Sequence, residues 1–381
     1  MTTPASLTIG APFPFFVAPT LSNPRFQFGS VAGRWICLVF IGSAGNERTA
    51  SFLSTLFQRA DRFDGVRCAF FGVSVDPEDV QRQPDRVPGI RWFRDHQGEL
   101  SRAVGVLSPP VPEYRPVALV LDPTLRIHTI IPASPEAAEP LGALLDALPA
   151  PADHVGVPQT APVLVVPRVL SPDLCNRLIA HYHEVGGKPS GFMREVDGKT
   201  VGAYDEAAKR RTDAEITSEA LRTEVRDGVV RALVPMIQRA FQFNATRIER
   251  YIVACYDGAD QGFFRAHRDN TTPGTAHRRF AVSINLNTGE YEGGGITFPE
   301  FGNTVYHAPL GGAVVFSCSL LHEAQPVTRG KRYATLPFLY DEASARLRQA
   351  NAGTLVSGQT PLEQPGAVSK IQVSQAAPVR A

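Results

Sequence analysis

Apolar and polar residues follow one pattern up to about residue 150 and a different one after it. In the first half, unbroken apolar runs at residues 35–41 and 67–76 alternate with helical patterns at residues 47–60 and 134–148. Runs without polar alternation are typical of strands that are buried on both faces, so this half predicts an α/β sandwich. The other elements expected here are strands at 116–122 and 125–132, a helix at 98–106, and Ser134 as the cap of the closing helix.

The second half begins with helices and then changes to short strands. Ser171 is expected to cap a helix that reaches residue 184, and Pro235 should interrupt a long amphipathic pattern at residues 217–243. Asp197-Gly198 is a hairpin signal. Many short strands separated by Gly, Pro and Asn predict a double-sheet jelly roll with supporting helices. The expected strands are residues 161–167, 247–256, 262–268, 279–286, 295–298, 303–307, 312–317 and 331–340.

Length and composition predict two domains. A chain of 381 residues exceeds one ordinary core, and the proline-containing stretch at residues 151–160 has no periodic pattern. After a short helix at residues 342–349, the sequence is poor in large apolar residues and is expected to be disordered or loosely draped. The predicted division is 1–152 for the first domain, 153–160 for the linker, 161–345 for the second domain and 346–381 for a low-complexity tail.

Charge and cysteine content indicate which partners and which cellular location to expect. The 38 basic and 37 acidic residues give a net charge of +1, which offers no reason to expect nucleic acid as a partner. The chain has no apolar run of the roughly 20 residues that a membrane span needs, and its first residues do not resemble a secretory signal. The five cysteines form no C-x-x-C pair, so a reducing, cytoplasmic location is expected.

Several short segments of the first half form a recognisable set. They are Gly10-Ala11-Pro12-Phe13-Pro14, Cys37-Leu38-Val39-Phe40, Val73-Ser74-Val75-Asp76-Pro77, Phe93-Arg94-Asp95 with Gly105-Val106, and Arg115-Pro116 before Leu119-Val120-Leu121-Asp122. Through these segments the first half resembles the peroxiredoxin branch of the thioredoxin fold. The resemblance implies a peroxidatic cysteine in the first turn of the helix after the first long strand. Residues 42–49 contain no sulfur there, and Cys37 and Cys68 fall inside apolar runs. Arg115 matches the family's flanking arginine but has no thiol to activate. The domain is predicted to be catalytically silent, with docking of a partner or self-association as its role.

The candidate chemistry lies in the second half. His267 and Asp269 are two residues apart in an expected strand, so both side chains should leave the same face. His322 ends the apolar run that starts at residue 313, and Arg332 follows ten residues later. Two imidazoles and one carboxylate form the facial triad that holds iron(II) with coordination positions left open, and an arginine is suited to clamp a carboxylate.

Residues 250–340 look like the prolyl-4-hydroxylase branch of the iron(II)- and 2-oxoglutarate-dependent dioxygenases. The resemblance implies that His267, Asp269 and His322 bind the iron and that Arg332 binds the far carboxylate of 2-oxoglutarate, while dioxygen takes the last position. Lys331 is a rival to Arg332, but strand alternation points it away. Tyr256 is expected to donate its hydroxyl to the cosubstrate and Asn285 to touch it; ascorbate is a further candidate cofactor. The motifs are Tyr251-Ile252-Val253-Ala254-Cys255-Tyr256, His267-Arg268-Asp269-Asn270, Ile284-Asn285-Leu286-Asn287, Gly293-Gly294-Gly295-Ile296-Thr297-Phe298-Pro299, His322-Glu323-Ala324-Gln325-Pro326-Val327 and Arg332-Tyr333.

The predicted function is therefore hydroxylation of an unactivated C–H bond with release of succinate and CO2. The substrate remains open between a peptidyl or amino-acid-like compound and another small molecule. Two alternatives stand beside it: a thiol redox or peroxide-handling protein acting through the first domain, and a non-enzymatic binding protein.

The basic cluster at residues 209–211 is interpreted as a solvated loop before a helix, with guidance of an acidic substrate as the alternative. Cys318 and His181, His183, His277 and His307 are interpreted as packing or surface residues.

Overall fold

The computed structural model describes residues 7–108, 113–355 and 368–371. The chain divides into two compact units, Met1–Ala161 with Pro299–Asn303, and Pro162–Phe298 with Thr304–Ala381. The boundary follows Ala161, and Pro151–Asp153, at the start of the stretch interpreted as a linker, forms a short 3-10 helix. Within the described ranges, none of the helices combines the length and the apolar character that crossing a bilayer requires.

The first unit is an α/β sandwich around a five-stranded sheet in the order β5-β4-β3-β8-β9. Strands β3, β4 and β5 run parallel, and β8 and β9 are antiparallel to their neighbours. Every residue of β3 and β4 is buried, as the unbroken apolar runs predicted. The strands are β1 (Val17–Ala18), β2 (Phe26–Gln27), β3 (Trp35–Gly42), β4 (Cys68–Ser74), β5 (Ile90–Arg94), β6 (Leu107–Ser108), β7 (Glu113–Tyr114), β8 (Val117–Leu121) and β9 (Ile127–Pro132).

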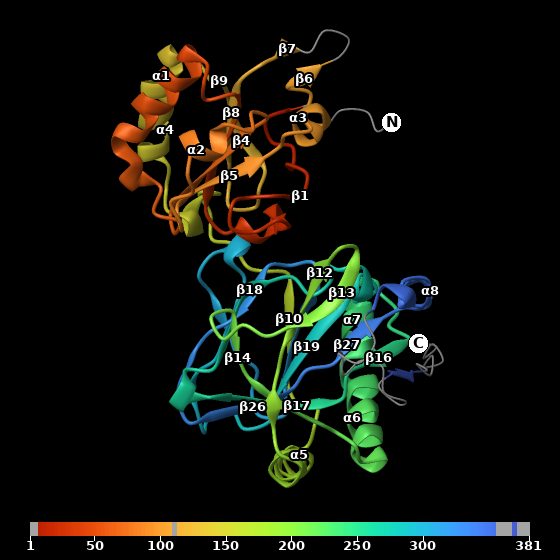
Figure 1. Cartoon of the computed structure of the whole chain (residues 1–381). Coiled ribbons are helices and arrows are strands. Elements are labelled where there is room, and N and C mark those ends of the chain that lie inside the picture. The colour runs from red at the N-terminus through yellow and green to blue at the C-terminus, as the bar shows by residue number, and fades with distance from the viewer. Residues whose placement is uncertain (1–6, 109–112, 356–367, 372–381) are drawn as a thin grey trace, which may run out of the picture. The chain divides into compact units, whose positions relative to one another are not determined.

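Two helices lie side by side on one face of this sheet (Figure 1). They are α1 (Glu47–Leu56) and α4 (Ala138–Ala147), and their buried residues share one core with inward residues of β3 and β4. Helices α2 (Asp79–Arg82) and α3 (Glu99–Ala103) are short. Ser134 makes no capping hydrogen bond, because residues Pro135–Ala137 form a 3-10 turn before α4. The cap predicted at that serine is therefore wrong.

The second unit contains a large and a small antiparallel sheet, the jelly roll that the strand pattern predicted. The large sheet runs β11-β15-β17-β26-β19-β27-β16-β28, and β23 joins it through β19 and carries β10. Its strands are β10 (Val163–Val166), β11 (Lys188–Pro189), β15 (Thr212–Glu215), β16 (Arg247–Glu249), β17 (Ile252–Asp257), β19 (Phe280–Asn285), β23 (Ala313–Ser317), β26 (Lys331–Thr335), β27 (Phe338–Tyr340) and β28 (Val368–Lys370).

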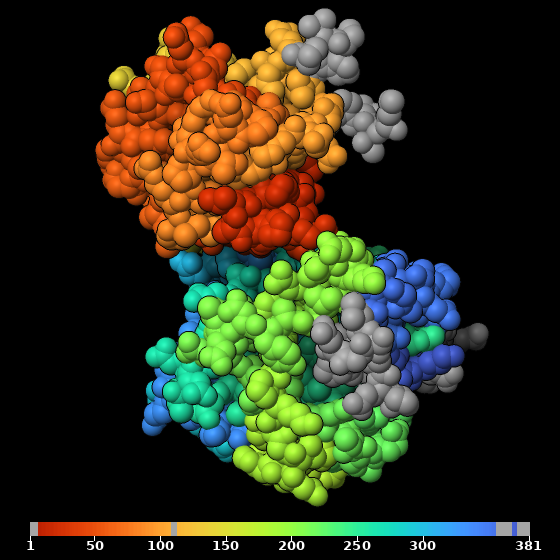
Figure 2. Space-filling view, in the orientation of Figure 1, coloured from red at the N-terminus to blue at the C-terminus, as the bar shows by residue number. Residues whose placement is uncertain are grey.

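The small sheet has the order β14-β18-β24-β21-β22. A separate hairpin, β12–β13, turns at Asp197-Gly198, where both residues have positive φ as predicted. In the space-filling view, the lime-green segment that leads from α5 (Pro172–Val185) to β15 covers much of the visible face of this unit (Figure 2). The remaining strands are β12 (Phe192–Val196), β13 (Lys199–Ala203), β14 (Lys209–Arg210), β18 (Phe263–His267), β20 (Glu292–Gly293), β21 (Ile296–Thr297), β22 (Val305–Tyr306), β24 (His322–Ala324) and β25 (Val327–Arg329).

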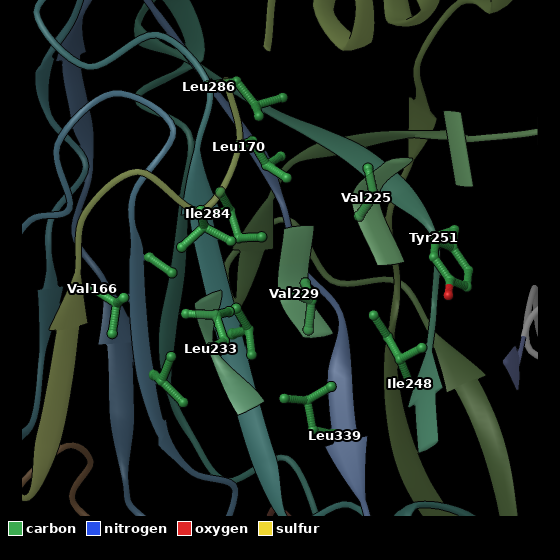
Figure 3. Packing of buried hydrophobic residues seen from close by; sticks show 14 of the residues in the cluster. Val166, Leu170, Val225, Val229, Leu233, Ile248, Tyr251, Ile284, Leu286 and Leu339 are labelled. Atoms are coloured by element: carbon green, nitrogen blue, oxygen red, sulfur yellow. The ribbon is translucent and has the colours of Figure 1, made fainter. Parts of the chain in front are cut away.

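Helices support the large sheet from outside. In α5 (Pro172–Val185), the Ser171 side chain accepts a hydrogen bond from the Leu174 amide, which confirms that cap. The long amphipathic pattern forms α6 (Glu219–Ala232) and α7 (Val234–Phe241), with Pro235 in the first turn of α7. Apolar side chains of α6 point toward those of the sheet strands (Figure 3), so the helix packs as a support. Helix α8 (Glu342–Ala350) follows the last jelly-roll strand.

Two local features differ from the sequence expectation. The predicted strand 247–256 breaks at Arg250, whose φ of 70° separates β16 from β17. The strand expected at 312–317 is confirmed as β23, and a turn separates it from β24. In the tail, β28 pairs with β16 and Ile371 is buried, so this part is not loosely draped; residues 356–367 and 372–381 lie outside the described residues.

Candidate active site

Two neighbouring strands of the small sheet bring the metal-binding candidates together. His267 ends β18 and His322 begins β24, and the two residues are direct partners in the antiparallel register. Asp269 follows β18, and its amide donates to the Cys318 carbonyl at 3.0 Å. One potential ligand atom from each of the three side chains lies within 4.8 Å of the others. The structure therefore assembles the predicted triad.

Backbone hydrogen bonds orient both imidazole rings. His267 Nδ1 is 2.7 Å from the Arg265 carbonyl oxygen, and His322 Nδ1 is 3.0 Å from that of Leu320. A carbonyl oxygen can only accept, so each Nδ1 carries the proton and each Nε2 keeps its lone pair. The Nε2 atom of His267 lies 3.6 Å from one carboxylate oxygen of Asp269, and that of His322 lies 3.4 Å from the other. Two neutral nitrogen donors and one oxygen donor thus converge, the donor set that suits iron(II).

Electrostatics keep His322 and Asp269 in the protonation states that a metal requires. Burial, and next the neighbouring His267, lower the pKa of His322 to about 4, which leaves its imidazole neutral at pH 7. Burial alone would raise the pKa of Asp269, but His322 and His267 together outweigh it and hold that pKa below its ordinary value. An anionic carboxylate beside the neutral imidazole of His322 fits a divalent cation.

The triad opens into a half-open pocket whose lining residues come from both sheets. Apolar side chains form much of its wall, and the triad shares it with three arginines. An apolar wall with convergent polar groups is the usual form of a small-molecule site. The lining residues are Arg211, Arg250, Tyr256, Phe264, His267, Asp269, Ala281, Val282, Ser283, Ile296, Phe316, His322, Ala324, Arg332, Leu336 and Phe338.

Arg332 is only 2% exposed and lines this pocket. Its Nη2 donates to Ser283 Oγ at 2.7 Å and to Asn285 Oδ1 at 3.0 Å. In the described part of the chain it forms no ion pair with a carboxylate, so its charge is available to an anionic ligand. Lys331 is exposed and pairs with Asp257 at 2.7 Å, which agrees with the prediction that it points away.

Tyr256 and Asn285 both contact arginines. Tyr256 is the register partner of Arg332, whose guanidinium lies 5.2 Å from the tyrosine ring centroid. The Tyr256 hydroxyl accepts a hydrogen bond from Arg211 at 3.3 Å, so its own proton is left for another acceptor. Asn285 donates to the Ala308 carbonyl and the Tyr291 hydroxyl and accepts from Arg332. Its amide therefore orients Arg332, while the role in cosubstrate contact stays a prediction.

The basic cluster at residues 209–211 is not a solvated loop. Lys209 is 6% exposed and Arg211 is 8% exposed. Arg211 donates from Nε and Nη2 to the two oxygens of Asp213, both at 2.7 Å, and it lies against the Tyr256 ring. The expectation failed because β14 and β15 belong to the two sheets, and this pairing between distant segments leaves no signal in the local sequence.

Arg250 is a charged pocket residue to which the sequence interpretation gave no role. It occupies the break between β16 and β17, and its Nε donates to the Leu336 carbonyl at 3.1 Å. Its guanidinium lies 4.6 Å from the Phe338 ring centroid. No local motif marks it, because an arginine within an apparent strand looks like a solvent-facing residue.

The first unit has no reactive thiol in its structure. All five cysteines of the chain are free and buried. Burial raises the pKa of Cys68 to about 12 and that of Cys37 well above its ordinary value. Before α1, the Ala44 amide donates to the buried carboxylate of Asp79 at 2.8 Å, and Asn46 caps the helix. The amide groups that would stabilise an anion there already have acceptors.

Comparison with known proteins places residues 251–340 in the 2OG-Fe(II) oxygenase superfamily. A PKHD-type hydroxylase from Gluconacetobacter diazotrophicus is 30% identical over 167 residues, which are 40% of this chain and 71% of that protein. A second PKHD-type hydroxylase, from Cupriavidus metallidurans, is 28% identical over 151 residues, 37% of this chain and 64% of its relative.

Among solved structures, a Trichoplax adhaerens prolyl hydroxylase in complex with a hypoxia inducible factor peptide matches 51% of this chain and 90% of that chain, with a TM-score of 0.38 and 17% identity. The peroxidoxin BcpB from Mycobacterium tuberculosis matches 38% of this chain and 99% of that chain, with a TM-score of 0.33 and 18% identity. These two scores do not assign a fold by themselves. The identity and coverage of the first hydroxylase relative show the family, and the chain belongs to the 2OG-Fe(II) oxygenase superfamily, among the PKHD-type hydroxylases.

Proposed function

We propose that the second unit hydroxylates an unactivated C–H bond with iron(II), 2-oxoglutarate and dioxygen. In the balanced reaction, substrate C–H, O2 and 2-oxoglutarate give substrate C–OH, succinate and CO2. One observation carries the proposal: the triad of His267, Asp269 and His322 shares a pocket with Arg332, a buried cation that has no carboxylate partner in the described part of the chain. A metal and an anionic cosubstrate would both be held there.

The chain's own residues contribute binding, orientation and exclusion of water. The three donors would hold iron(II), which together with 2-oxoglutarate supplies the activation of dioxygen. Arg332, positioned by Ser283 and Asn285, would hold the far carboxylate of the cosubstrate. The free proton of the Tyr256 hydroxyl would reach an oxygen of the same molecule. Phe264 and Phe316, which lie against the two histidine rings, shield the centre from water.

The first experiment measures succinate formed by the full chain with iron(II), 2-oxoglutarate and dioxygen. We expect turnover in the wild type and none in Asp269→Ala. Retained turnover in that variant would overturn the proposal. If the wild type is active and the variant is not, the substrate would be sought in cell extract. It would be a compound that gains one oxygen atom, and the search would be made with and without added ascorbate.

For the first unit we propose a role without redox chemistry, either docking of a partner or self-association. The absence of a thiol before α1 and the buried cysteines support this role over peroxide reduction. The five free thiols also suit a reducing cytoplasm, which we propose as the location. Deleting the first unit and comparing activity and substrate range would test whether it serves the oxygenase.

A further inference from the structure

Arg250 presents a second cation to the pocket. Its φ of 70° is uncommon for a residue with a side chain, and such backbone conformations gather at ligand sites. The break places Arg250 before β17, whereas Tyr256 and its register partner Arg332 lie near the other end of that strand. Both arginines line the same pocket. Arg250 and Arg332 are therefore two separate cations that line one pocket.

Neighbouring residues hold the Arg250 guanidinium in place without using its terminal amino groups. Nε is bound to the Leu336 carbonyl, and the guanidinium lies on the ring of Phe338. Arg278 lies on the same ring at 4.0 Å, and Glu249 anchors it with a hydrogen bond of 2.8 Å. Across the described residues, no hydrogen bond or ion pair engages Nη1 or Nη2 of Arg250. These two groups are a preformed fork for a ligand.

The charges around the pocket leave Arg250 without a counter-ion. Asp213 neutralises Arg211 through two hydrogen bonds, and Glu249 neutralises Arg278. Asp269 is committed to the metal, and Arg332 to the cosubstrate. Burial, and next the charge of Arg211, lower the pKa of Arg250 to about 10. It still remains a cation at neutral pH, and a half-buried cation without a counter-ion favours the binding of an anion.

We propose that Arg250 binds a carboxylate of the molecule that is hydroxylated, so that the substrate is a carboxylic acid. This inference rests on the proposed function, because it assigns Arg332 to 2-oxoglutarate. A guanidinium fork matches a carboxylate in two parallel hydrogen bonds. Ala281, Val282 and Leu336 add an apolar wall in the same pocket, which suits the carbon skeleton of the acid. The acid is either a free compound or an acidic side chain of a peptide.

The test compares carboxylic acids with their primary amides as ligands. The full-length protein is loaded with Mn(II) and 2-oxoglutarate without dioxygen, and binding is measured by calorimetry. One arm uses free amino acids and their carboxamides, such as L-proline and L-prolinamide. The other uses end-blocked pentapeptides that contain Glu or Gln. We expect at least one acid to bind roughly 10-fold or more tightly than its amide, and the arm in which it occurs identifies the source.

Variants connect this preference to Arg250. Arg250→Met should bind acid and amide equally, and Arg250→Lys should keep a weaker preference because it keeps the charge without the fork. The control Arg329→Met removes an exposed arginine paired with Glu292 and should keep the full preference. A wild type that prefers no acid overturns the inference, as does a preference that survives in Arg250→Met. Wild-type succinate formation is measured separately, so failure of the proposed function is recognised independently.

Discussion

His267 and His322 are register partners across β18 and β24, and both present Nε2 to the carboxylate of Asp269. Each imidazole ring is oriented by the backbone carbonyl of the residue two positions before it in the chain. The pairing of the small sheet therefore brings the three candidate metal ligands together. This arrangement leads to the first prediction.

Replacing His267 or His322 by alanine should abolish tight iron(II) binding. Loss of a residue that only supports a ligand costs roughly 10–100-fold in metal affinity, and loss of a ligand itself should cost at least as much. Metal content after dialysis, together with anaerobic titration with Fe(II), measures the effect. His128→Ala changes an exposed histidine of the first unit and serves as the matched control. A His267→Ala protein that binds iron like the wild type would contradict the assignment.

Arg332→Met should raise the KM for 2-oxoglutarate by roughly 10- to 100-fold, because a charge-assisted hydrogen bond to a buried carboxylate is lost. Arg332→Lys should recover part of that loss, since the charge remains while the paired geometry does not. Steady-state succinate formation across a range of 2-oxoglutarate concentrations provides the measurement. An unchanged KM in the methionine variant would place the cosubstrate elsewhere.

Tyr256→Phe should weaken cosubstrate binding less than loss of Arg332 does. The change removes one hydroxyl and leaves the ring against Arg332 and Arg211, so a loss of about 1 kcal/mol is expected. Iron affinity should stay at the wild-type value because the hydroxyl is not a metal ligand. The same kinetic titration and metal assay distinguish the two effects. A large loss of iron with an unchanged KM would contradict this role.

The thiols of the folded protein should be inert. Burial raises the pKa values of Cys37 and Cys68, so almost no thiolate is present near pH 8. A thiol-reactive chromophore should label the native chain very slowly and label all five cysteines after unfolding in urea.

Hydrogen peroxide should be consumed at the same rate with wild type and with a Cys37→Ser, Cys68→Ser double variant. Faster consumption by the wild type would revive the redox alternative.

Because of Glu249, the free energy of unfolding should depend on pH. Burial alone would raise its pKa, but Arg278 and His277 outweigh it and lower that pKa to about 2, from an ordinary value of 4.5. Because the folded-state pKa is depressed, its stabilisation is fully present above pH 4.5 and is lost as the pH falls from 4.5 through 2. The loss is on the order of 3 kcal/mol.

Urea unfolding at several pH values tests this dependence. Glu249→Gln should be less stable than the wild type at pH 7 and should lose less stability on acidification. The exposed Glu292→Gln is the control, and its profile should follow that of the wild type. Parallel profiles for Glu249→Gln and the wild type would exclude the buried cluster as the source.

The sequence alone determined the features whose signals are local. The unbroken apolar runs of β3 and β4, the Ser171 cap, the break near Pro235 and the Asp197-Gly198 turn each depend on neighbouring residues. The residues His267, Asp269, His322 and Arg332 were also identified from their motif spacing. The sequence also showed that residues 42–49, just before and at the start of α1, contain no cysteine.

Only the tertiary structure decided which charges are buried and which partners they have. Arg211 and Lys209 looked like a solvated loop, yet pairing of β14 and β15 with distant strands buries them. Arg250 looked like one residue of a continuous strand, yet its positive φ and its contact with Phe338 place it in the pocket. β28 pairs with β16 although its sequence suggested a loose tail. Strand partners come from residues far away in the chain, so local periodicity carries no information about them or about the burial that the pairing causes.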